Sequence, residues 1–97
     1  MTVAIPANAK PYKRTATFTE TTIPAGLLGD HSTKEGTWGL IRLEEGALRY
    51  VVTDERRPPS EQVLTVAGEP GVVEPTILHH VAPVGPVRFH VEFLRVD

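Results

Sequence analysis

The stretch PGVVEPTILHHV, residues 70–81, decides the fold that we expect for this chain. Pro70 and Gly71 are typical of a tight turn, and the two valines after them are typical of a short strand. Pro75 interrupts that strand, because proline has no N–H group for a ladder hydrogen bond. The chain then enters a second strand at two histidines, which the turn before them would hold in a fixed place.

The same alternation of turn residues and short apolar segments recurs along the chain and predicts about seven or eight short strands. The expected strands are residues 12–22, 36–43, 47–53, 62–67, 72–74, 78–82 and 87–96, with turns at 44–46 and 83–86. No window shows the 3.6-residue period of an amphipathic helix, so no helix longer than about two turns is expected. The predicted fold class is all-β, in the form of a sandwich, jelly roll or small barrel.

Composition limits the function classes. The chain has 97 residues, which fits one domain, and we expect a flexible N-terminal arm over residues 1–11 and a folded domain over 12–97. Ten basic and twelve acidic residues give a net charge of −2, which argues against nucleic acid as a partner. The absence of cysteine excludes disulfides and thiolate metal sites.

Targeting signals are not apparent in the sequence. No apolar run approaches the roughly 20 residues of a membrane span, so no membrane partner is expected. The first residues lack the basic and apolar regions of a signal peptide. The expected location is therefore the cytoplasm.

Three histidines are candidate ligands. His79 follows the proline-broken strand, and its neighbour His80 would point to the opposite face, so at most one of them enters the core. His31 follows Asp30, a carboxylate that could orient a metal-binding imidazole. The alternative for each histidine is an ordinary place in a loop or at the surface.

Two further candidates lie on the last predicted strand. His90 and Glu92 share the polar face of this strand, because Phe89, Val91 and Phe93 lie on the opposite, apolar face. That polar face is directed to solvent by default.

Two segments carry a resemblance to a known family. HSTKEGTWG, residues 31–39, and VEPTILHHV, residues 73–81, resemble the small cupin-like domain at the N-terminus of the tellurite-resistance methyltransferase TehB, which stand-alone proteins of the YeaR type share. The similarity runs from about residue 12 to residue 95. It implies a single-domain cupin-like jelly-roll β-barrel that binds a divalent metal. The implied metal ligands are His31 and His79, with Glu92 as a third, acidic ligand.

The sequence also departs from that family's pattern. Typical cupins carry two histidines and a glutamate in the first motif, whereas here only His31 remains and Gly39 lies about where the glutamate would be. The third ligand therefore stays open between Glu92, His90, Glu74 and water. The expected cofactor is a divalent metal, with zinc as the named candidate; histidine, carboxylate and water also suit Fe, Mn, Ni or Cu. The methyltransferase domain, with its S-adenosylmethionine site, is not in this sequence.

The resemblance implies a small metal-binding protein that acts in a stress or oxyanion response, of the tellurite or nitrite type. The alternatives are a non-catalytic module for small-ligand binding or regulation, and a metal-dependent enzyme such as an isomerase or dioxygenase. The enzyme would need an acid or base near the metal. Glu74 and Tyr50 are the candidates for that group, and no catalytic residue is assigned from the sequence. The expected partners are a small molecule or oxyanion and, because the strands are long and the core small, a second copy in a homodimer.

Overall fold

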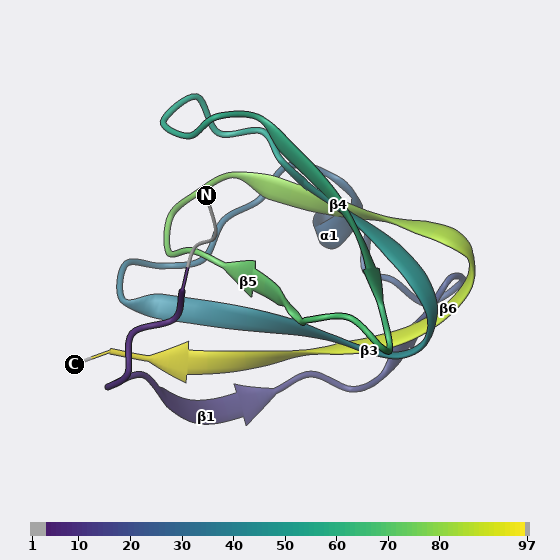
Figure 1. Ribbon diagram of the computed structural model, residues 1–97, viewed down its shortest axis with the longest axis horizontal. Coiled ribbons are helices and arrows are strands. Elements are labelled where there is room, and N and C mark those ends of the chain that lie inside the picture. The colour runs from purple at the N-terminus through teal and green to yellow at the C-terminus, as the bar shows by residue number, and fades with distance from the viewer. Residues whose placement is uncertain (1–3, 97) are drawn as a thin grey trace.

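The computed structural model describes residues 4–96, and two long strands form its centre. β3 (Thr37–Val52) and β6 (His79–Arg95) pair antiparallel along nearly their whole lengths. Each strand bends near its middle, where the register shifts and where Gly46 and Gly85 have φ angles of 77° and 71°. In Figure 1 both strands turn back at the right, so that the two ends of each strand lie at the left in two layers.

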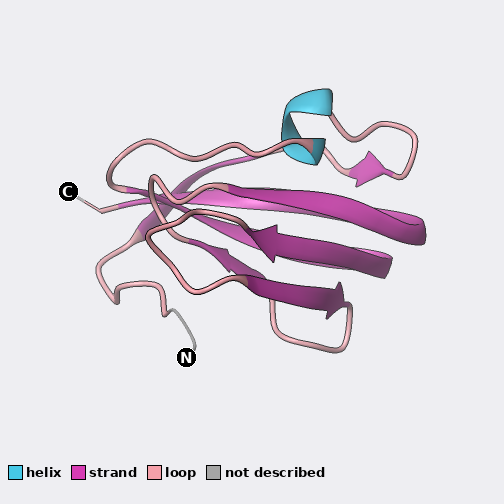
Figure 2. Cartoon of the chain, turned by 90° about the horizontal axis from the view of Figure 1, so that it is seen from above, coloured by secondary structure: helices cyan, strands magenta, loops and turns pink. Residues whose placement is uncertain are grey.

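The remaining elements extend this central pair. β1 (Lys10–Arg14) and β2 (Phe18–Thr19) pair with β6, whereas β4 (Ser60–Thr65) and β5 (Gly71–Val73) pair with β3. The only helix among residues 4–96 is α1 (Ala25–Leu28), which lies at one side of the strands (Figure 2). The all-β prediction is confirmed. No helix of the described chain is long and apolar enough to cross a membrane.

The element boundaries differ from the prediction at the two bends. The turns expected at 44–46 and 83–86 are wrong, because β3 and β6 continue through them. Gly46 lets β3 bend and Gly85 lets β6 bend, and the backbone pairing of the two strands continues beyond the bend.

The first strand also differs from its prediction. The segment expected over 12–22 is split into β1 and β2, and β1 already begins at Lys10, which pairs with Arg95. Part of the predicted flexible arm is therefore in the sheet. Residues 1–3 of that arm, and Asp97 of the predicted domain, lie outside the described residues.

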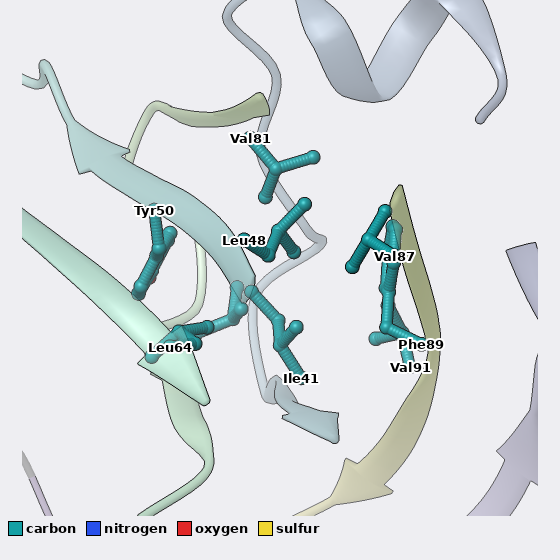
Figure 3. Close-up of a cluster of buried hydrophobic side chains, with 9 residues drawn as sticks. Ile41, Leu48, Tyr50, Leu64, Val81, Val87, Phe89 and Val91 are labelled. Atoms are coloured by element: carbon teal, nitrogen blue, oxygen red, sulfur yellow. The ribbon is translucent and has the colours of Figure 1, made fainter. Parts of the chain in front are cut away.

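The core lies between the two layers. Leu48 and Phe89 have no exposed surface, and Ile41 and Val87 are at most 2% exposed. Figure 3 shows the side chains of β3 and β6 facing each other across the space between the layers. The two ends of β6 lie in different layers on the same side of the molecule (Figure 1).

Candidate ligand pocket and histidine pair

The fold brings His31 and His79 together from distant parts of the sequence. Their backbones form an antiparallel bridge, in which each N–H donates to the other residue's carbonyl oxygen at 2.9 Å. The centroids of the two imidazole rings are 4.2 Å apart, and the ring planes are tilted by 56°. The backbone bridge thus fixes the distance between two candidate ligands.

Backbone carbonyls also fix the orientation of both rings. The Nδ1 atom of His31 lies 2.9 Å from the oxygen of Gly29, and Nδ1 of His79 lies 2.9 Å from the oxygen of Ile77. A carbonyl oxygen can only accept, so in each ring Nδ1 carries the proton and donates it. In the neutral form Nε2 is then the nitrogen with a free lone pair, which is the arrangement common in metal-binding histidines.

The surroundings of His79 keep it neutral. The residue is 3% exposed, and the ring of Tyr50 packs edge-on against it with centroids 5.6 Å apart. Burial lowers the pKa of His79, and the neighbouring His31 adds to this lowering, although the hydrogen bond to Ile77 opposes it. At neutral pH the Nε2 lone pair of His79 is therefore available to a ligand.

The histidine pair lines a pocket of about 520 Å³. The pocket lies over β6, β3 and β5, and the segment from Pro24 to Lys34 covers one side of it. Its floor is apolar and includes Phe89 and Val91. A pocket of this volume falls within the range of small-molecule sites.

Comparison with known proteins identifies the family. A family model of the TehB-like domain matches residues 13–91, which is most of the chain. The chain belongs to the TehB-like domain family. No curated protein sequence matches it.

Two solved structures share the fold of this TehB-like domain. TehB from Haemophilus influenzae has a TM-score of 0.83 and 24% identity over 92% of this chain, which spans only 32% of that protein. A protein from E. coli strain K12 has a TM-score of 0.81 and 24% identity over 99% of both chains. At this level of identity the similarity shows the fold alone.

The neighbouring histidine of the TehB-like domain points away from the pocket. His80 Nδ1 donates to the Asp30 carboxylate at 2.9 Å, and this hydrogen bond lowers the pKa of Asp30. The prediction that adjacent strand histidines face opposite sides is confirmed. Asp30 does not hold the ring of His31, whose Nδ1 is bonded to the Gly29 carbonyl instead.

The structure does not bring a third protein ligand to His31 and His79. Glu92 faces Arg42 at 3.5 Å on the other side of the sheet, and His90 Nδ1 donates to Glu44 at 2.7 Å. Neither Glu92 nor His90 lines the pocket. Within residues 4–96, no group of three or more histidine, aspartate or glutamate side chains is placed to hold a metal ion.

The two acid–base candidates lie in a separate hollow. Tyr50 and Glu74 line a cavity of about 440 Å³ on the other side of β5 from the main pocket. The Tyr50 hydroxyl donates to the carbonyl oxygen of Val72 at 2.9 Å, and burial, with a smaller effect of Glu74, raises the pKa of Tyr50 to about 12. Glu74 forms an ion pair with Arg57. Neither group is free to serve the histidine pair.

A buried carboxylate that the sequence did not single out holds the turn before His79. Asp54 is 6% exposed and accepts hydrogen bonds from the backbone N–H of Leu78 at 2.9 Å and from that of Arg56 at 2.8 Å. The Arg56 guanidinium donates to both oxygens of Asp54 and to the carbonyl of Thr76. The only signal in the sequence was an acidic residue just after a strand, two residues before an arginine.

Proposed function

We propose that this TehB-like domain binds a divalent metal ion through Nε2 of His31 and Nε2 of His79. The observation that supports this is the anchoring of both Nδ1 atoms by backbone carbonyls, which leaves the same nitrogen of each ring unbonded to the protein. The neutral state of His79 at pH 7 supports it further. Imidazole nitrogen is a ligand for zinc, copper, nickel and iron.

The rest of the coordination shell would come from outside the protein. Glu92, proposed from the sequence as the third ligand, pairs with Arg42, so water or a bound small molecule is better suited to the remaining positions. A metal with open positions acts as a Lewis acid or as a docking centre for an oxygen ligand. Together with the family membership, this supports a role in the response to a toxic oxyanion such as tellurite or nitrite.

Metal titration of two histidine variants tests the proposal. His79→Ala should weaken zinc binding by at least about tenfold, because it removes one of two nitrogen ligands. His80→Ala should leave binding within about twofold of the unmodified chain, because His80 faces Asp30. The measurement is calorimetric titration with zinc on protein prepared without a histidine tag.

His31→Ala is the second variant, for the case in which His79→Ala does not fold. His31 is only partly buried, so its removal should leave the thermal melt of the domain nearly unchanged and still weaken zinc binding. Equal binding by the unmodified chain and a folded variant of either pocket histidine would exclude the site.

A second proposal concerns assembly as a homodimer. β4 pairs with β3 alone among the described strands, and Val63 in β4 and Val66 after it are 56% and 57% exposed. An exposed edge strand with exposed valines favours pairing with another copy. Sedimentation of the unmodified chain should give twice the chain mass of 10.6 kDa. A monomer at micromolar concentration would contradict the dimer.

Two valine variants locate the contact. Val63→Lys should shift the chain from dimer to monomer. Val84→Lys, at an exposed valine outside β4, should leave the dimer intact.

A further inference from the structure

The main pocket has a charge distribution unlike that of the whole chain. Lys13, Lys34 and Arg95 line it, whereas no aspartate or glutamate of the described residues does. The whole chain, in contrast, has more acidic than basic residues and a net charge of −2. The three cations come from β1, from the loop before β3 and from the end of β6, so the fold gathers them at one rim. Their combined field attracts an anion.

Arg95 is held in place at this rim. Its guanidinium carbon lies 4.3 Å from the centroid of the Tyr12 ring, which also lines the pocket. Its backbone pairs in register with Thr37, another lining residue. Within residues 4–96, no carboxylate forms an ion pair with Arg95. A guanidinium held in this way binds carboxylates with two parallel hydrogen bonds.

Below the rim the pocket is apolar. The hydrophobic residues that form its floor and inner walls include Phe18, Val73, Val81, Phe89, Val91 and Phe93. They come from β2, β5 and β6, and the rings of Phe18 and Phe89 meet edge to face with centroids 5.7 Å apart. An apolar floor below a cationic rim suits a ligand with one anionic end and an apolar body.

We propose that the pocket binds a small organic carboxylate, whose head group lies between Lys34 and Arg95 and whose apolar body lies on the floor. Without a bound metal, an inorganic oxyanion would contact only the cationic rim and would leave the floor without contacts. The inference depends on residues other than the histidine pair, so the metal site and the carboxylate site can be tested separately.

The experiment is calorimetric titration of the full chain with linear carboxylates from acetate to octanoate, at low salt and with EDTA present. Affinity should rise by about fourfold for each methylene added until the pocket is filled, since each buried methylene contributes a nearly constant increment. Hexanoate should bind at least about tenfold more tightly than hexanol, and hexylamine should not bind measurably.

Charge variants locate the head group. Lys34→Gln and Arg95→Gln should each weaken hexanoate binding by about fivefold to tenfold. Arg88→Gln, which removes an exposed arginine of the same strand outside the pocket, should leave it unchanged. Zinc binding in the absence of carboxylate should be the same in all three variants.

Three results would overturn the inference. One is hexanoate binding that both rim variants retain in full, and another is hexylamine binding as tightly as hexanoate. The third is phosphate binding as tightly as hexanoate, which would leave the apolar floor without a role. Loss of zinc binding in His79→Ala with hexanoate binding intact would support both sites as separate. Zinc binding that His79→Ala abolishes, without measurable hexanoate binding by the unmodified chain, would leave only the metal site. Hexanoate binding without zinc binding by the unmodified chain would leave only the carboxylate site.

Discussion

Gly46→Ala should destabilise the chain by about 3 kcal/mol or more, the largest effect that we expect of any single methyl group. Gly46 has a φ angle of 77°, and a Cβ atom there would lie 2.1 Å from the carbonyl oxygen of Pro86. The backbone of Pro86 cannot move away without breaking the bend that β3 and β6 share. The measurement is equilibrium unfolding in urea, followed by tryptophan fluorescence.

Gly85→Ala is the matched control. Gly85 has nearly the same φ angle, 71°, but a Cβ atom there would have no neighbour within 4 Å. Only the cost of the left-handed conformation remains, about 1 kcal/mol. Equal losses of stability in the two variants would mean that backbone conformation alone, and not the close approach of the strands at the bend, requires glycine at position 46.

The strands were predictable from the sequence, but their continuity was not. Alternation of apolar residues placed Leu48 and Tyr50 on one buried face, and both are at most 3% exposed. The segment 44–46 has the composition of a hairpin turn. Local composition cannot show that β6 bends beside this segment and stays paired with β3 on both sides of the bend. The bends are set by pairing between segments far apart in the sequence.

The candidate site was predictable only in part. The proline-broken strand and the resemblance to the TehB family led to His31 and His79, which do lie together. Sequence spacing could not show that Glu92 faces Arg42, because the choice of faces depends on which side of β6 is covered. Nor could it show that Lys34 and Arg95 share a rim, since two separate elements bring them there.

Asp54→Asn is the second variant for which we expect a large effect. It should lower the Tm of the domain by more than about 10 °C at pH 7. The carboxylate of Asp54 accepts hydrogen bonds from Arg56 and from the backbone of Leu78, directly before His79. An amide in its place would point donors at the Arg56 guanidinium and leave that group without its charge partner. The turn that positions His79 would lose its main support.

Acid should weaken the same contact in the unmodified chain. Hydrogen bonds from Arg56, then from the Leu78 and Arg56 backbone, hold the pKa of Asp54 well below its ordinary value. The folded state therefore binds this proton less readily than the unfolded chain. The contribution to stability is fully present above the unfolded pKa of about 3.9 and is lost as pH falls below it toward the folded value.

Thermal melts between pH 7 and pH 2 measure this contribution. The Tm of the unmodified chain should fall more steeply below pH 4 than that of Asp54→Asn, so the two curves should approach each other in acid. Glu55→Gln, at the exposed neighbouring carboxylate, should follow the unmodified chain throughout. Parallel curves for the unmodified chain and Asp54→Asn would mean that the charge of Asp54 does not hold the turn, and that its shape and backbone hydrogen bonds alone do so.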